Sequence, residues 1–185
     1  MRMKQDVVAP AVSRRPSIAI LVAVSAVSPL AMNIYLPSMP GLVEYFGTTM
    51  SEVQLTLSLY LAAIALAQIG IGPLSDRFGR RPVLLWGFGI FLAGSLICAL
   101  THSISVFLVG RILQAGGGCV GIVLGRAIVR DLFDRRQAAS MIGYVTMGMA
   151  VAPMVGPAIG GVLDQTFGVE AISYFVIAVG LIVSL

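Results

Sequence analysis

Long apolar segments alternate with short polar connections, and this pattern constrains the sequence more than any other feature. A helix needs about 20 apolar residues to cross about 30 Å of hydrocarbon. Five apolar segments are long enough to cross: Ser17–Leu36, Val53–Ile71, Val83–Leu100, Val106–Gly125 and Ala138–Leu163. A sixth begins near Ala171 and is incomplete. Hydrophobic residues make up 58% of the chain and charged residues 11%, against about 45–50% and about 25% in soluble domains. We therefore predict an integral membrane protein.

The apolar segments favour helices over other membrane structures. Lipid offers no partners to free backbone groups, which a helix satisfies internally. Strands of a β-barrel would be about 10 residues long with strict alternation, whereas these segments are longer and apolar on all faces. A disulfide scaffold is excluded because the two cysteines, Cys98 and Cys119, lie inside apolar segments.

The basic residues predict the orientation of the helices. Eleven of the 12 Lys and Arg residues would lie on one side: Arg2, Lys4, Arg14, Arg15, Arg77, Arg80, Arg81, Arg126, Arg130, Arg135 and Arg136. Under the positive-inside rule this side is the cytoplasm. We therefore expect a cytoplasmic tail at residues 1–16 and a transmembrane bundle at residues 17–185. The same bias explains the basic charge of the chain without nucleic-acid binding.

The first and last apolar segments bear on how the chain begins and ends. A cleaved signal peptide is rejected because the first apolar segment exceeds the usual length of about 7–15 residues. The segment from Ile172 to Leu185 has fourteen residues, or roughly 21 Å of helix, which is too short to cross the bilayer. We expect a truncated protein or a fragment that ends inside its sixth span.

A dense motif follows the second span at residues 72–82, reading GPLSDRFGRRP. Gly72 and Pro73 predict the end of a helix and a tight turn, and Asp76 should stay ionised and pair locally among three arginines. The motif resembles the signature loop of the major facilitator superfamily, G-x-L-[AS]-D-R-x-G-R-[RK]. The resemblance implies a cytoplasmic gating loop that latches the two halves of a transporter, formed by Gly72, Asp76, Arg77, Gly79, Arg80 and Arg81.

The fourth span contains an arginine, Arg111. A guanidinium cannot lose its charge, and its insertion into lipid costs at least about 2.5–3.5 kcal/mol. Arg111 should therefore face a watery cavity or a partner, unless it snorkels to the outer surface. With Gln114 and Gly116 it resembles the family's helix-four motif, R-x-x-Q-G, although the glycine falls one position late. The resemblance implies a part in proton coupling.

The fifth span is rich in small residues, which allow helices to approach closely. Its Pro157 is expected to bend the helix. The pattern resembles the family's antiporter motif, G-x8-G-x3-G-P-x2-G-G, through Gly143, Ala152, Gly156, Pro157, Gly160 and Gly161. The resemblance implies an exporter that exchanges its substrate for protons, and it speaks against the alternative of a sugar or metabolite symporter.

The first span narrows the resemblance to the Bcr/CflA group of drug-resistance transporters. That group carries D-[MI]-Y-L-P-[AS]-[LM]-P, and residues 33–40 read NIYLPSMP. The usual membrane acid is replaced by Asn33, whose amide does not titrate at physiological pH. No other acid lies deep in a span. The coupling acid lies in a missing half, or the substrate is neutral or anionic, or transport has been lost.

Together these observations and the resemblance imply an all-α bundle equivalent to the N-terminal six-helix half of a twelve-helix facilitator. Such halves contain inverted three-helix repeats, but the sequence itself shows no clear internal repeat. The resemblance implies export of small amphipathic drugs across the bacterial inner membrane by proton antiport. The alternative is an inactive truncated remnant, or a half that needs a second chain. No enzyme activity, organic cofactor or metal is implied. The expected substrate-binding residues are Asn33, Tyr35, Tyr60, Arg111 and Gln114.

Three further features received structural interpretations. Gly116-x-Gly118-x-x-Gly121 satisfies a dinucleotide-binding fingerprint, but no strand precedes it, and we interpret it as part of a smooth helix face. His102 is expected to be solvated in a short outer turn. Trp86 is expected to contact lipid.

Overall fold

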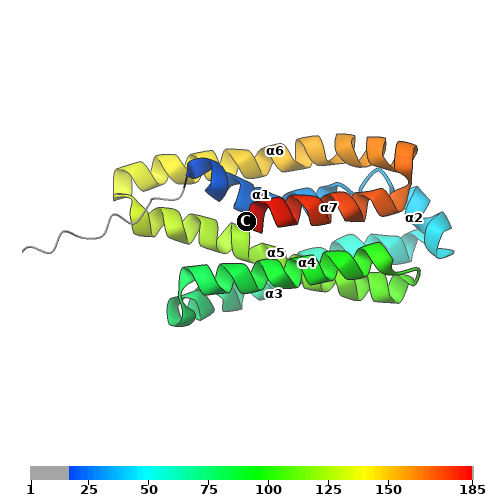
Figure 1. Cartoon of the computed structure of the whole chain (residues 1–185), viewed down its shortest axis with the longest axis horizontal. Helices are drawn as coiled ribbons and strands as arrows, with labels where there is room; N and C mark the ends of the chain where they lie inside the picture. The colour runs from blue at the N-terminus through cyan, green and yellow to red at the C-terminus, as the bar shows by residue number, and fades with distance from the viewer. Residues whose placement is uncertain (1–16, 185) are drawn as a thin grey trace, which may run out of the picture.

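The computed structural model describes residues 17–184 and contains seven helices in this range (Figure 1). They are α1 (Ile18–Asn33), α2 (Met39–Phe46), α3 (Met50–Phe78), α4 (Arg80–Leu100), α5 (Ile104–Leu132), α6 (Arg135–Phe167) and α7 (Val169–Ser184). The predicted tail at residues 1–16, with its four basic residues, lies outside the described residues. The predicted all-helical fold is confirmed over the described range.

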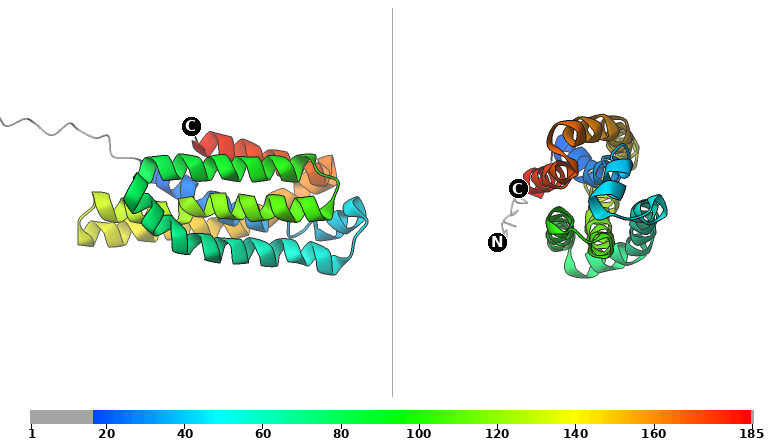
Figure 2. Two further views of the ribbon diagram at one scale, coloured as in Figure 1. Left: turned by 90° about the horizontal axis from the view of Figure 1, so that it is seen from below. Right: turned by 90° about the vertical axis from the view of Figure 1, so that its right-hand side faces the viewer.

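The six long helices run along one axis in alternating directions (Figures 1 and 2). The central helix α5 packs against α3, α4 and α1, and α1 packs in turn against α6. Viewed end-on, α1, α6 and α7 lie on one side of the bundle and α3, α4 and α5 on the other (Figure 2). Four helices, α3 to α6, are long and apolar enough to cross a membrane, whereas α1 and α7 are shorter apolar helices.

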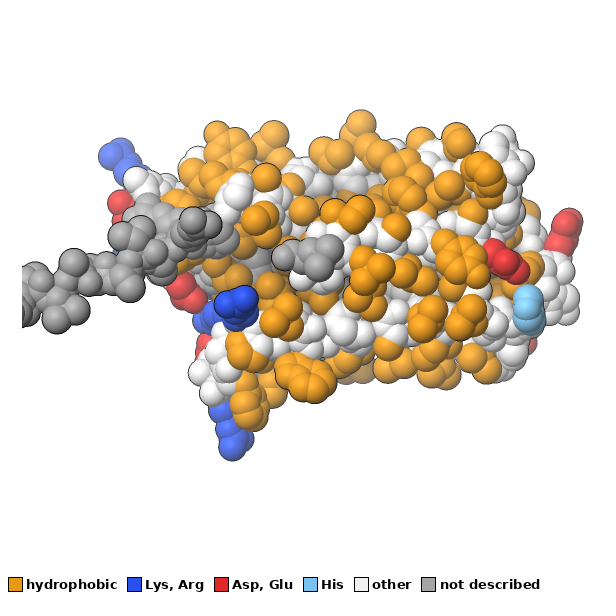
Figure 3. All heavy atoms as spheres, in the orientation of Figure 1, with side chains coloured by type: hydrophobic (Ala, Val, Ile, Leu, Met, Phe, Trp, Pro, Cys, Tyr) orange, Lys and Arg blue, Asp and Glu red, His pale blue; other side chains and the backbone are white. Residues whose placement is uncertain are grey.

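The surface agrees with a membrane location. Apolar side chains cover the middle of the visible face, while charged side chains gather at its two ends (Figure 3). The α3–α4 and α5–α6 connections share one end, so Arg77, Arg81 and Arg135 lie there together, as predicted for the basic side. We call this the basic end of the bundle.

The short helix α2 was not predicted. No helix was expected between the first two apolar segments, but the structure places an eight-residue helix there, at the end opposite the basic residues. Pro40 lies in its first turn, where a missing N–H costs nothing. Gly47 ends the helix with φ 58°, a left-handed conformation suited to glycine. Its Leu42 is buried and holds it on the bundle.

The predicted turn at Gly72 and Pro73 is wrong. Helix α3 continues through both residues to Phe78, and only Gly79 separates it from α4. Pro73 lacks the N–H that would bond to the Ile69 carbonyl, and membrane helices tolerate such a loss. Separately, Ser75 Oγ donates to the Gly72 carbonyl over 2.8 Å. The true turn is at Gly79, with φ 92°, and its N–H bonds to the Ser75 carbonyl.

Candidate functional site

The centre of the bundle depends on close contact between α4 and α5. A Cβ added to Gly94 would lie 2.4 Å from the Gln114 backbone nitrogen and 2.7 Å from the Gly110 carbonyl. Only glycine at position 94 allows this approach. It brings Ser95 of α4 and Gln114 of α5 within hydrogen-bond distance, where Gln114 Nε2 donates to Ser95 Oγ over 2.8 Å.

Arg111 lies fully buried at this centre, with 0% of its surface exposed. Its guanidinium carbon lies 4.6 Å from the ring centroid of Tyr35 and 4.3 Å from that of Tyr60. Desolvated cation–π contacts of this kind contribute about 2 kcal/mol or more. Nη1 also donates to the Ala31 carbonyl over 3.0 Å and to Gln114 Oε1. The snorkelling alternative is therefore wrong: Arg111 points into the protein and has partners there.

The partners of Arg111 are themselves anchored on other helices. Tyr60 donates to the Ser28 carbonyl over 3.1 Å, and the Tyr35 hydroxyl lies 2.8 Å from Ser173 Oγ. These contacts link α1, α3, α4, α5 and α7 through one cation. We call Arg111, Tyr35, Tyr60, Gln114 and Ser95 the arginine cluster. Nε and Nη2 of Arg111 have no hydrogen-bond partner among the described residues, although such groups are costly to bury.

The structure thus brings together four of the five predicted substrate-binding residues, and each of the four is at most 2% exposed. The fifth, Asn33, lies apart from the arginine cluster. It is half-buried near the end of α1, and its Nδ2 donates to the Pro29 carbonyl over 2.8 Å. This bond stays within its own helix.

Asn33 faces the glycines of the predicted antiporter motif in α6. A Cβ on Gly156 would lie 3.4 Å from Asn33 Cβ, and a Cβ on Gly160 would lie 1.9 Å from the Ile34 carbonyl. Ala152 is buried too, and Gly161 approaches Pro37. Pro157 is half-buried within α6, which is assigned as one continuous helix. Most of the motif is therefore the surface on which α1 packs.

Two positions depart from the predicted packing. Gly143 is exposed and a Cβ there would meet nothing within 4 Å. Gly148, which the motif does not include, packs tightly on Val22 instead. Glycine in a membrane helix is a signal for close contact, but the sequence does not say which glycine faces a neighbouring helix.

The predicted gating residues lie around the α3–α4 connection at the basic end. Arg80 Nη2 lies 2.9 Å from Asp76 Oδ1, and Arg80 Nε lies 3.1 Å from Asp131 Oδ2. The local pairing predicted for Asp76 is thus confirmed, while Asp131 of α5 is a partner that the loop motif alone did not indicate. Arg77 instead stacks over Phe78, 5.3 Å from the ring centroid. Because both ion pairs are partly exposed, each contributes about 1 kcal/mol at most.

His102 is exposed in the short turn between α4 and α5, as expected, but it also has a hydrogen-bond partner. At the end opposite the basic residues, the Tyr45 hydroxyl lies 2.7 Å from His102 Nδ1 and donates to Glu170 over 2.8 Å. Partial burial, with the Glu170 contact adding to it, raises the pKa of Tyr45 to about 12. The cluster ties α2 to α7 and to the α4–α5 turn. The sequence analysis missed this cluster because its residues are far apart in the chain, Tyr45 and His102 by 57 positions.

These features define a polytopic membrane bundle built around a buried cation, with small residues at its helix contacts. Residues 21–185 match the profile described as the Major Facilitator Superfamily. The chain belongs to this family, whose members are transporters.

Several similar proteins have names that refer to drug resistance. The chain is 44% identical over 147 residues to a chloramphenicol resistance protein of Pseudomonas aeruginosa, covering 79% of this chain and 35% of the relative. It is 34% identical to multidrug resistance protein D of Escherichia coli, covering 85% and 40%. It is 32% identical to a bicyclomycin resistance protein homolog of Haemophilus influenzae, covering 85% and 40%. The chain thus spans well under half the length of these relatives.

Proposed function

We propose that this chain forms the N-terminal half of a drug exporter of the bacterial inner membrane, driven by proton antiport. The names of its relatives support the substrate class, and the antiporter-like motif of α6 supports the mode of coupling. The concentration of arginines at one end supports an N-terminus in the cytoplasm. The whole transporter would contain a second six-helix half, because alternating access requires one bundle to move against another.

One observation carries this proposal above the others. Gly156 and Gly160 of α6 pack directly on Asn33, the last residue of α1, and on Ile34, which follows it. Two separate motifs that resemble the drug:proton antiporters therefore meet in one helix contact. Any change in the angle between α1 and α6 moves Asn33, so this contact couples the shape of α6 to the proposed binding position.

The five proposed substrate-binding residues would then divide into two groups. Asn33 is half-buried and is proposed to contact substrate directly. Tyr35, Tyr60, Arg111 and Gln114 are enclosed, and we propose that they contact substrate only when the helices separate. A buried cation that is incompletely hydrogen-bonded stores electrostatic free energy. It favours a second arrangement in which the guanidinium meets water or an anionic group.

The gating residues have a corresponding role in this proposal. Asp76, Arg80 and Asp131 link α3, α4 and α5 at the basic end. The weak, exposed ion pairs can exchange partners at low cost. A second half would complete the latch by offering charged or helix-terminal groups to Asp76.

Chimeric transport tests the proposal. Residues 1–185 are produced together with the C-terminal half of the P. aeruginosa relative, and assembly is verified by co-purification. We expect the assembled pair to raise chloramphenicol tolerance and to extrude drug when a proton gradient is imposed, while neither half does so alone. An assembled pair without efflux would contradict the export proposal and favour the inactive remnant. Efflux by residues 1–185 alone would contradict the requirement for two halves.

Asn33→Asp is predicted to alter the coupling of the assembled pair. The carboxylate cannot donate to the Pro29 carbonyl as the amide does, and it restores a titratable group at the position where the Bcr/CflA group carries an acid. We expect drug efflux to become more strongly dependent on pH, measured as initial rates over a range of external pH. Asn33→Ala serves as the control, because it removes the same hydrogen bond without adding an acid. Identical pH profiles for the three proteins would exclude position 33 as the limiting group.

A further inference from the structure

An apolar groove opens on the outer face of the bundle between α3 and α4, near the basic end. Its volume is about 410 Å³. The walls come from Ile71, Leu74 and Phe78 of α3 and from residues 82–90 of α4. A second hollow of about 400 Å³ adjoins it, lined by Arg81, Pro82, Leu85 and Trp86. Pro82 and Trp86 line both hollows, so the two lie next to each other with these side chains between them.

The floor of the groove exists because α5 carries glycine there. Gly117 packs against the backbone of α4, where a Cβ would lie 2.3 Å from the Phe91 nitrogen and 2.5 Å from the Gly87 carbonyl. The neighbouring Gly116 also lines the groove, but a Cβ on it would meet nothing within 4 Å. Gly117 therefore brings the helices together, whereas Gly116 leaves space. A larger side chain at position 116 would fill that space.

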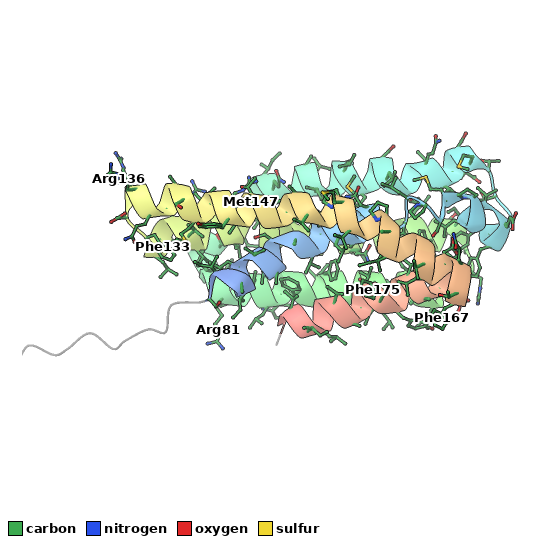
Figure 4. All side chains as sticks on the ribbon, turned by 90° about the horizontal axis from the view of Figure 1, so that it is seen from above. Arg81, Phe133, Arg136, Met147, Phe167 and Phe175 are labelled. Atoms are coloured by element: carbon green, nitrogen blue, oxygen red, sulfur yellow. The ribbon has the colours of Figure 1, made fainter. Side chains whose placement is uncertain are left out.

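Two arginines flank the mouth of the groove. Arg77 stacks on Phe78, which belongs to the α3 wall. Arg81 begins the α4 wall, and Figure 4 shows its side chain extending away from the helices. Among the ion pairs formed within residues 17–184, Arg80 is the basic partner each time. Arg77 and Arg81 thus remain available to an anion that approaches from outside.

The spacing of these features along α4 matches one leaflet of a bilayer. Trp86 is 75% exposed and lies five residues beyond Arg81, or about 7–8 Å along the helix. Tryptophan favours this interfacial depth. Ile90, at the inner end of the groove, lies about 13 Å from Arg81 along the axis. This is close to half of the hydrocarbon thickness of about 30 Å.

We propose that this groove is a binding site for an anionic phospholipid of the leaflet at the basic end. The phosphate lies between Arg77 and Arg81, and one acyl chain lies along the α3–α4 groove with Trp86 beside it. The second hollow holds the other chain. Positive charge at the mouth and an apolar interior together fit an amphipathic anion, and neither a free phosphate nor a neutral oil satisfies both. The bound lipid would hold the ends of α3 and α4 together across Gly79.

The proposal is tested on the complete transporter, assembled from both halves and purified in a neutral detergent. Thermal unfolding is followed during titration with dioleoylphosphatidylglycerol or dioleoylphosphatidylcholine, and bound lipid is counted by native mass spectrometry. We expect phosphatidylglycerol to bind and to raise the melting temperature at lower concentrations than phosphatidylcholine. Equal effects of the two lipids would overturn the proposal, because the arginines would then not discriminate between an anionic and a zwitterionic headgroup.

Two variants locate the site. Arg77→Gln with Arg81→Gln is expected to weaken phosphatidylglycerol binding by about tenfold or more, since each arginine near a membrane surface contributes about 1 kcal/mol. Arg135→Gln with Arg136→Gln removes the same charge from exposed positions at the same end and should bind lipid as the unaltered protein does. Equal weakening by both pairs would overturn the proposal in favour of a general surface charge effect.

Gly116→Leu tests the apolar part of the site. It is expected to reduce lipid binding by occupying the groove, whereas Gly89→Leu, at an exposed α4 position with nothing within 4 Å, should not. If both leucine variants bind lipid normally, the groove is not the site. Inorganic phosphate that reproduced the full thermal shift would show a free-anion site and overturn the lipid assignment, as would displacement of the lipid by chloramphenicol at equal concentration.

Discussion

Arg111→Met is expected to abolish drug efflux by the assembled transporter while leaving the free energy of unfolding within about 2 kcal/mol of its original value. The expected loss of function is complete: efflux should fall to that of cells without the transporter. Efflux of drug under an imposed proton gradient measures the first effect. Thermal or denaturant unfolding in detergent measures the second.

We expect efflux and stability to respond differently to this substitution because of the surroundings of Arg111. Two of its three guanidinium nitrogens are buried without hydrogen-bond partners, so the charge itself opposes folding. Methionine fills similar space between the Tyr35 and Tyr60 rings and forms favourable sulfur–aromatic contacts. Gln114 Oε1 and the Ala31 carbonyl each lose a donor, at about 1–3 kcal/mol each, and the cation–π contacts with Tyr35 and Tyr60 are lost. Removal of the incompletely solvated charge offsets these costs.

Arg111→Lys is the matched variant for charge. It keeps the positive charge but loses the planar group that stacks on both rings while it donates to Ala31 and Gln114. We expect it to be inactive as well. Wild-type efflux by either variant would contradict a functional role for the guanidinium. Loss of folded protein in Arg111→Met would instead assign Arg111 to stability.

Gly117→Ala is expected to destabilise the bundle strongly, by about 3 kcal/mol or more. Its Cβ would lie 2.3 Å from the Phe91 nitrogen and 2.5 Å from the Gly87 carbonyl. These are backbone atoms of α4, so no side-chain rotation can relieve the contact. The helices must separate, and the α4–α5 packing that positions Ser95 against Gln114 is lost with it.

The adjacent Gly116→Ala is the control for this prediction. Its Cβ would meet nothing within 4 Å, and alanine favours the helix over glycine by about 0.8–1 kcal/mol. We therefore expect Gly116→Ala to be neutral or slightly stabilising. Melting temperatures in detergent compare the pair. Equal melting temperatures would show that α4 and α5 do not approach closely at Gly117.

A large part of this architecture could be predicted from local properties of the chain. Apolar length indicated where helices cross the bilayer, and the placement of arginines indicated which connections share an end. Both signals are local because the bilayer acts on each segment independently, through the cost of burying charge and free backbone groups. The ion pair of Asp76 with Arg80 was predictable for the same reason, since the two residues are only four positions apart in the sequence and face each other across the turn at Gly79.

Other features required the packed bundle. The proline at position 73 suggested a helix end, but contacts around α3 keep the helix intact to Phe78. Helix α2 has only eight residues, so the length of its apolar segment does not identify it as a helix. The hydrogen bond between Tyr45 and His102 joins residues 57 positions apart, and no sequence period brings them together.

The surroundings of Arg111 illustrate the difference most clearly. Its charge and its position inside a span made a buried partner or a cavity necessary, because a guanidinium stays charged at any physiological pH. The choice of Tyr35 and Tyr60 as its neighbours came only from the packing of α1 and α3 on α5. The need for a partner follows from the charge of one residue in an apolar solvent. Which residues become its partners depends on the mutual positions of several helices, and the glycines at the helix contacts determine those positions.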